Sequence, residues 1–156
     1  MPLLVLESWC AMTLSGSNTL TGRALHPGSS SGELLILDQP ISFWGGVDHH
    51  GVIIDVHHPQ CGVSVAGKVL VMTSGRGSSS ATAVLAELIR AKKAPAAMIF
   101  TECDIILVIG ALVSAELYQI QMPMVELTEE LYAKIPKTGS ISVDAYSEDM
   151  VGLIKW

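Results

Sequence analysis

The chain has few charged side chains and few aromatic ones. Asp, Glu, Lys and Arg make up 15% of the 156 residues, and Phe, Trp and Tyr make up 5%. Ordinary soluble domains carry about 25% charged residues. Because a domain of this size has a large surface to cover, the shortage of charge predicts that part of that surface is apolar and meets a partner. An unusually apolar monomer is the alternative.

Basic side chains are scarce as well. Nine Lys and Arg stand against fifteen Asp and Glu, which gives a formal net charge of −6. The sequence has no basic stripe that would displace the counterions of a nucleic acid. Its one small cluster, Arg90, Lys92 and Lys93, falls at the end of a predicted helix, where cations favour the helix dipole. The sequence therefore predicts no nucleic-acid partner.

Cysteines are few, odd in number and widely spaced: Cys10, Cys61 and Cys103, with no C-x-x-C pattern. This argues against a disulfide framework and fits the reducing cytoplasm. No run approaches the ~20 apolar residues of a membrane-spanning helix. Residues 1–6 are apolar but lack the basic start of a signal peptide, and Glu7 interrupts them. We expect a cytoplasmic protein with no membrane partner.

The length and the hydrophobic pattern predict one α/β domain. Strands are predicted at 21–25, 33–37, 52–56, 68–72, 96–100, 124–126 and 140–143, with a turn-rich link at 26–32 and a short extended piece at 41–44. Helices are predicted at about 79–91, after an Asp104 cap, and after a Thr128 cap. Strands come first and then alternate with helices, so we expect a β-layer from the first half and a β/α layer from the second half. Residues 1–20 are expected to be an N-terminal extension, 21–145 the domain, and 146–156 a tail that packs on a partner.

Residues 73–80, Thr-Ser-Gly-Arg-Gly-Ser-Ser-Ser, are the most informative stretch. They link a predicted buried strand to a predicted amphipathic helix. Gly75 and Gly77 let the backbone bend and approach a ligand closely. The three serines lie where the helix begins, beside unpaired backbone N–H groups, and Arg76 can pair with a carboxylate or a phosphate. The loop is neither a Walker A motif nor a G-x-S-x-G elbow.

The same loop predicts a reactive hydroxyl. A serine becomes a usable base near neutral pH when several N–H donors and a cation stabilise its oxyanion. Ser78 is the best placed serine, because it directly follows Gly77 at the predicted start of the helix. We expect Ser78 to be catalytic and Arg76, Gly77, Ser79 and Ser80 to bind the substrate. A plain serine helix cap, which stabilises by about 1 kcal/mol, is the structural alternative.

Two histidine pairs are candidate metal ligands. His49-His50 and His57-His58 lie near Asp48 and Asp55. Adjacent residues on a strand point to opposite faces, so each pair offers one side chain per face, and the spacing matches no known metal signature. The alternative is that all four are solvated histidines in turns.

Cys103 is a further candidate ligand. It follows the predicted strand 96–100, and the ends of parallel strands share one edge, so Cys103 should lie near Ser78. Cys103 is either a small buried residue or one ligand of an iron–sulfur cluster. Because one cysteine cannot hold a cluster, the other ligands would come from another chain.

Six short pieces of the sequence occur in an order that is typical of one family. They are Gly-Gly-Val-Asp at 45–48, Gly-Val-Ile-Ile-Asp at 51–55, Gly-Lys-Val-Leu-Val at 67–71, Gly-Arg-Gly-Ser-Ser at 75–79, Ala-Pro-Ala-Ala at 94–97 and Gly-Ala at 110–111. Together they resemble the swivel, or small-subunit, part of aconitase X proteins over about residues 22–143. The resemblance implies a swivelling β/β/α domain and a dehydratase completed by a large catalytic subunit or domain that carries an iron–sulfur cluster. Family members dehydrate cis-3-hydroxy-L-proline or mevalonate 5-phosphate.

The resemblance also implies roles for the loop residues. In the wider aconitase family, the first serine of a Gly-Ser-Ser-Arg motif abstracts the substrate proton, which corresponds to Ser78, and the next serine corresponds to Ser79. Ser80 stands where the motif has arginine, and we infer that Arg76 supplies a replacement charge. The chain would then be a hydro-lyase for a small hydroxy acid, active only with its large partner.

Two alternatives concern the substrate and the class of protein. The His-His-Gly run and the Gly-Arg-Gly-Ser-Ser-Ser wording favour the hydroxyproline type, whereas a separate small chain is more usual for the phosphomevalonate type. A mobile phosphohistidine carrier that uses His49 or His57, or a non-catalytic binding module, is the alternative from another class.

Overall fold

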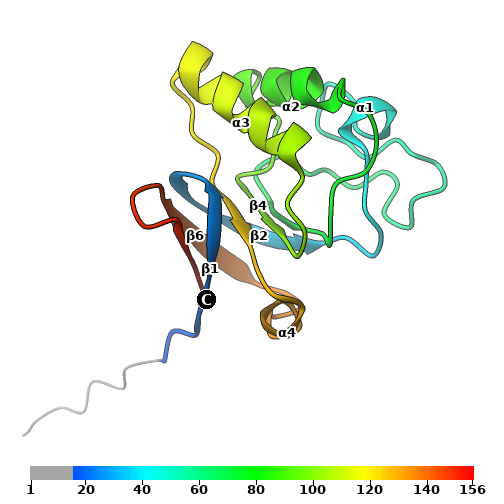
Figure 1. The fold of residues 1–156 in the computed structure, drawn as a ribbon. Helices are drawn as coiled ribbons and strands as arrows, with labels where there is room; N and C mark the ends of the chain where they lie inside the picture. The colour runs from blue at the N-terminus through cyan, green and yellow to red at the C-terminus, as the bar shows by residue number, and fades with distance from the viewer. Residues whose placement is uncertain (1–15) are drawn as a thin grey trace, which may run out of the picture.

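In the computed structural model, which describes residues 16–156, seven strands close into a barrel (Figure 1). The mixed α/β fold class is confirmed. The order around the barrel is β1-β5-β4-β3-β2-β6-β7. The strands are β1 (Thr19–His26), β2 (Gly28–Ile36), β3 (Val69–Val71), β4 (Ala97–Phe100), β5 (Met124–Glu126), β6 (Ser140–Tyr146) and β7 (Val151–Lys155). The helices are α1 (Phe43–Gly46), α2 (Ala81–Arg90), α3 (Ile105–Tyr118) and α4 (Glu129–Tyr132). Strands from both halves of the chain take part in this one barrel.

Four neighbouring strands of the barrel run parallel. β2 pairs with β3, β3 with β4, and β4 with β5, all in parallel, while β1, β6 and β7 make antiparallel pairs. The connections between the parallel strands carry α1, α2 and α3 in turn. The carboxyl ends of β2 to β5 therefore meet at one edge, which is where ligands bind in open α/β sheets.

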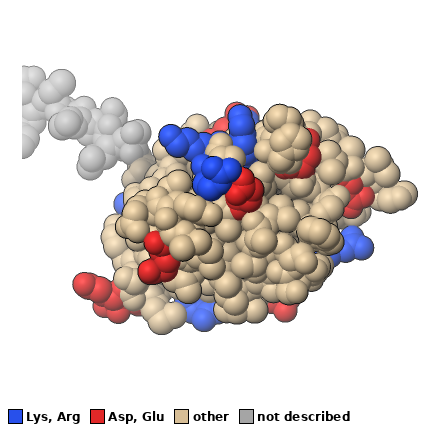
Figure 2. Space-filling view, turned by 90° about the horizontal axis from the view of Figure 1, so that it is seen from above, with Lys and Arg blue, Asp and Glu red and all other residues tan. Residues whose placement is uncertain are grey.

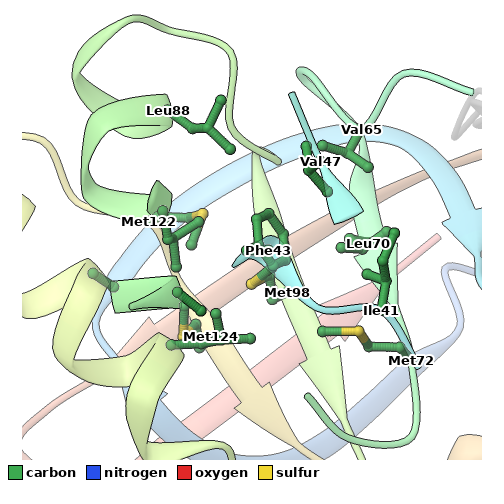
Figure 3. Packing of buried hydrophobic residues seen from close by; sticks show 14 of the residues in the cluster. Ile41, Phe43, Val47, Val65, Leu70, Met72, Leu88, Met98, Met122 and Met124 are labelled. Atoms are coloured by element: carbon green, nitrogen blue, oxygen red, sulfur yellow. The ribbon is translucent and has the colours of Figure 1, made fainter. Parts of the chain in front are cut away.

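The central strands are apolar throughout because both of their faces are buried. Val69 and Val71 of β3 belong to a cluster with members on all seven strands, which fills the barrel. Leu70 and Met72 point the other way, into a second cluster with Phe43 and residues of the helices (Figure 3). This alternation fixes which face of the sheet the helices cover.

Helices α2 and α3 lie side by side over that face (Figure 1). Gly110 of α3 faces α2 so closely that a Cβ atom there would lie 3.0 Å from the Thr82 carbonyl oxygen. The Thr82 hydroxyl donates a hydrogen bond of 2.8 Å to the Ile106 carbonyl. Gly110, which lowers the intrinsic helix propensity, is therefore the residue that lets the two helices touch.

Several segments differ from the expectation. Residues 26–32 do not form a turn-rich link, because β2 already begins at Gly28, where it pairs with β6. Residues 41–44 end in the short helix α1 instead of an extended piece. Residues 52–56 make only isolated bridges, Val47 to Ile53 and Val52 to Ser64, and no strand.

Both ends of the expected domain also differ. The residues expected to be a C-terminal tail contain β7, which pairs with β1 on one side and with β6 on the other and so closes the barrel. The expected N-terminal extension, residues 1–20, overlaps β1, which starts at Thr19. Residues 1–15, including Cys10, lie outside the described residues.

Between residues 16 and 156, no helix combines the length and the apolar character that crossing a bilayer requires.

Candidate functional site

Residues 73–80 connect β3 to α2 at the carboxyl edge of the parallel strands. The carbonyl of Thr73 accepts hydrogen bonds from the backbone N–H groups of Thr101 and Glu102, at 3.0 and 2.9 Å. These bonds tie the loop after β3 to the loop after β4. The structure thereby places the loop of Ser78 and the segment of Cys103 at the same edge.

A neighbouring side chain lies so close to each of the two glycines of the loop that a Cβ atom would not fit there. A Cβ atom on Gly75 would overlap the Asp104 carboxylate oxygen Oδ2 and lie 2.5 Å from its Cγ. A Cβ atom on Gly77 would overlap the Ser42 hydroxyl, and Gly77 also has a φ of 111°, which favours glycine. Asp104 and Ser42 thus hold the loop from two sides. The sequence showed the glycines, and it gave no sign of the two side chains that require them.

The Ser78 side chain is partly buried and takes part in one hydrogen bond. Its Oγ accepts a bond of 3.1 Å from the backbone N–H of Ser80. A hydrogen bond donated to an oxygen stabilises the deprotonated form of that oxygen. Within the described chain, no protein group accepts a hydrogen bond from the backbone N–H groups of Gly77, Ser78 or Ser79. These donors are therefore open to an anionic ligand.

The other loop residues are turned to solvent. Arg76, Ser79 and Ser80 are exposed, and Arg76 takes part in none of the salt bridges found among residues 16–156. Ser80 occupies the N-cap position of α2, yet its side chain makes no capping hydrogen bond. The Ser80 hydroxyl therefore makes no cap, whereas the Ser78 hydroxyl, which accepts the N–H two residues on, fits the plain cap alternative. An incoming ligand can reach the exposed side chains of Arg76, Ser79 and Ser80.

A small cavity of about 280 Å³, here called the loop cavity, lies beside these residues. Its lining comprises Ser74, Gly75, Gly77, Glu102, Cys103, Asp104, Ile105 and Ile106. Two carboxylates and no basic side chain line it, so the loop cavity is a poor site for an anion by itself. Ser78 and Arg76 lie outside its lining. The loop cavity is therefore not where these two side chains would meet an anion. A larger cavity of about 450 Å³, between α1 and α2, includes none of the loop residues.

Cys103 is held by a carboxylate that the sequence did not single out. Its backbone N–H donates a hydrogen bond of 2.7 Å to Glu126 Oε2, and Glu126 Oε1 forms a salt bridge of 2.8 Å with Arg23. Burial, followed by the Glu126 carboxylate, raises the pKa of the Cys103 thiol above its usual value. Because thiolates bind metals, this environment favours the protonated thiol over a metal ligand.

An iron–sulfur cluster does not fit the described residues alone. Among residues 16–156, no group of three or more His, Cys, Asp and Glu side chains is placed to hold a metal ion. Cys103 and the exposed Cys61 are the cysteines of the described part. Cys103 can therefore supply at most one ligand of a site completed elsewhere.

The four histidines of the two pairs differ in their exposure to solvent. His49, His50 and His57 are exposed, and the rings of the first two lie close together, with centroids 3.9 Å apart and planes tilted by 42°. The expectation of solvated turn histidines is wrong for His58, which is buried at 5% exposure. Its Nε2 lies 2.9 Å from the Gln39 carbonyl and its Nδ1 accepts from the Gln60 N–H at 3.0 Å. His58 therefore fastens two loop segments together.

Comparison with known proteins agrees with this architecture. The family model described as "Aconitase X swivel domain" matches residues 19–152. The chain belongs to the aconitase X swivel family. The resemblance drawn from the sequence motifs is confirmed by this match.

Relatives of two kinds lie in this family. The chain is 43% identical to a cis-3-hydroxy-L-proline dehydratase of Pseudomonas aeruginosa over 114 residues, which cover 72% of this chain and 20% of that protein. It is 35% identical to the phosphomevalonate dehydratase small subunit of Methanosarcina mazei, with 86% of this chain and 90% of that subunit covered. The chain thus spans about a fifth of the first relative and most of the second.

A solved structure shares the fold. The crystal structure of the holo form of Thermococcus kodakaraensis aconitase X superposes with a TM-score of 0.73 at 32% identity. The superposition covers 88% of this chain and 98% of the other.

Proposed function

We propose that the chain is the swivel part of a two-part dehydratase that removes water from a small hydroxy acid, with Ser78 as the proton acceptor. The observation that carries the proposal is the hydrogen-bonding of the loop. The Ser78 hydroxyl accepts the Ser80 N–H, while the neighbouring N–H groups and Arg76 remain open to a ligand at the edge where ligands bind. The relatives of both kinds are dehydratases by name.

The loop would act on a substrate carboxylate and on the adjacent carbon. Arg76 pairs with the carboxylate, and Gly77, Ser79 and Ser80 donate hydrogen bonds to it. The Ser78 oxyanion, stabilised by the Ser80 N–H and the helix start, takes the proton from the carbon next to that carboxylate. The electron pair of the broken C–H bond forms the carbon–carbon double bond, and the hydroxyl on the next carbon leaves with its bonding electrons. It becomes water by taking up a proton equivalent to the one that Ser78 accepted, whose release restores the oxyanion.

The departure of the hydroxyl must be assisted by groups outside residues 16–156. We place the iron–sulfur cluster expected for this family on the large catalytic subunit or domain, because the described residues cannot hold it alone. Cys103 remains a candidate for a single ligand. We expect the isolated chain to have no dehydratase activity, and we expect the two-part enzyme in the cytoplasm.

The proposal also concerns which of two compounds is the substrate. The higher identity, 43% against 35%, favours cis-3-hydroxy-L-proline, while the match to 90% of a phosphomevalonate dehydratase small subunit favours mevalonate 5-phosphate. We favour hydroxyproline and keep phosphomevalonate as the alternative. Incubating the reconstituted enzyme with each compound and following the unsaturated product decides between them. Acid-labile phosphate on His49 or His57, without turnover of either compound, would instead support a carrier.

A Ser78→Ala variant tests the proton acceptor. Removing a general base lowers turnover by about 10²–10⁴-fold, so we expect such a loss in the enzyme reconstituted with its large partner. The variant should still assemble, because the Ser78 side chain is not part of a core cluster. Ser31→Ala, at an exposed serine of β2, is the matched control and should leave turnover unchanged. Near-normal turnover by Ser78→Ala would reject the role of Ser78.

A further inference from the structure

The outer side of α3 is an apolar surface. Ile105, Ile109 and Leu112 are 61, 43 and 50% exposed. Their spacing of four and three residues places them on one side of the helix, here called the α3 stripe. Glu116 is the one charged residue among the fourteen of α3. Figure 2, which looks onto the helices from above, shows a broad area without charged side chains.

An exposed stripe of this kind indicates a protein that lies against it. Surface helices of soluble proteins normally carry polar residues on the side that faces water. The neighbouring helix α2 follows this rule, with Glu87 and Arg90 on its exposed side forming a salt bridge. The departure is therefore specific to α3, and contiguous apolar patches mark interaction sites.

The position of the stripe indicates which protein covers it. Ile105, at one end of the stripe, also lines the loop cavity beside Gly75 and Gly77. A chain that covers the stripe therefore reaches the edge that carries Ser78. The relatives point to the same occupant, because this chain corresponds to only 20% of the hydroxyproline dehydratase of Pseudomonas aeruginosa. The remainder of such an enzyme must lie against the swivel part to bring substrate to its loop.

We propose that the α3 stripe is the docking surface for the large dehydratase subunit. This inference rests on the proposed function. The exposed carboxylates of Glu102 and Glu116 flank the two ends of the stripe. We therefore expect an apolar patch on the large subunit with Lys or Arg at its rim.

Ile109→Glu/Leu112→Glu tests the docking surface. Burying two unpaired carboxylates in an apolar contact should weaken binding to the large dehydratase subunit of the same organism by about a hundredfold or more. Isothermal titration calorimetry gives the Kd, and thermal melting of the free chain verifies folding. Ile54→Glu/Val56→Glu is the matched control. These two residues are also apolar and are 46 and 78% exposed, but they lie in the connection between α1 and β3 and not on α3. If the double variant melts early, Leu112→Ser replaces it.

Each outcome supports or overturns the inference. If the α3 variant loses binding and the control variant does not, the docking surface is supported. If the wild-type complex forms but dehydrates neither substrate, only the proposed function is rejected. Equal Kd values for the α3 variant and the wild type overturn the docking surface. The proposed function still stands in that case if the wild-type complex turns over its substrate. Failure of the wild-type chains to bind overturns both. A wild-type dimer that the α3 variant abolishes, without any change in the Kd for the large subunit, shows that a second copy covers the stripe and also overturns the inference.

Discussion

Replacing Gly75 with alanine tests whether Asp104 holds the loop of residues 73–80. The new Cβ would overlap Asp104 Oδ2 and lie 2.5 Å from Asp104 Cγ. Alanine has no backbone conflict of its own at this position, because the φ of Gly75 lies outside the left-handed region. The cost must therefore arise from displacing the carboxylate or the loop.

The size of this cost follows from what the carboxylate does. Asp104 caps α3, with Oδ1 accepting from the Ile106 N–H at 3.0 Å, and losing such a cap costs about 0.5–2 kcal/mol. Shifting the loop instead costs about 1–3 kcal/mol, as overpacking does. We expect Gly75→Ala to lower the free energy of unfolding by about 1–2 kcal/mol.

A double-mutant cycle with Asp104→Ala isolates the contact. Once the carboxylate is absent, Gly75→Ala should cost about 1 kcal/mol less, because only the Asp104 Cβ, at 3.0 Å, still opposes the new methyl group. Urea denaturation gives the four free energies, and Gly16→Ala is a control in open space. Additivity of the two substitutions within about 0.3–0.5 kcal/mol would refute the reasoning.

Two further predictions concern histidines. Burial lowers the pKa of His26 below its usual 6.5, so the unfolded chain binds the proton more readily and the free energy of unfolding should fall as the pH drops through 6.5. His26→Asn, whose amide can still donate to the Met122 carbonyl, should flatten this dependence between pH 5.5 and 7.5 in denaturation curves; an unchanged slope would contradict the cause. His58→Ala should lower the free energy of unfolding by about 1–3 kcal/mol, because it removes the buried His58 ring and both of its hydrogen bonds. Exposed His49→Ala should leave it within about 0.5 kcal/mol, and equal effects of the two substitutions would contradict the structural role of His58.

The sequence predicted the parallel β/α part of the fold well, because each element there carries a strong local pattern. The four apolar residues of β4 are buried on both faces, and Asp104 caps α3 by accepting the Ile106 N–H, as its position before an apolar run indicates. Thr128 likewise caps α4. Such elements are set by neighbours in sequence, so a single chain is enough to find them.

The barrel closure was missed because it depends on distant pairing. β7 is short and contains Gly152, and its sequence Val-Gly-Leu-Ile-Lys does not alternate apolar and polar side chains, so its residues resemble a tail. Pairing with β1 and β6 on both sides makes it a strand. The first part of β2 was missed for the same reason, since its Gly-Ser-Ser-Ser sequence favours a turn until β6 supplies the hydrogen bonds.

The candidate site shows the same contrast between local patterns, which the sequence reveals, and contacts between distant segments, which it does not. The glycines and serines of residues 73–80 identified the loop, because their types are unusual at a strand-to-helix junction. The side chains that border the loop, Ser42 and Asp104, come from two other connections and carry no local pattern that points to it. Glu126, which binds the Cys103 N–H, ends β5. Only the parallel order of the strands brings them to one edge.

The pairing of β1 with β7 brings the two ends of the barrel to one corner. Asn18 and Trp156 exchange backbone hydrogen bonds of 3.1 and 3.2 Å, and Figure 1 shows this corner across the barrel from α2 and α3. A polypeptide joined to either end is attached at the same pivot. A single attachment point of this kind restricts the orientation of the module less than two separated attachments would.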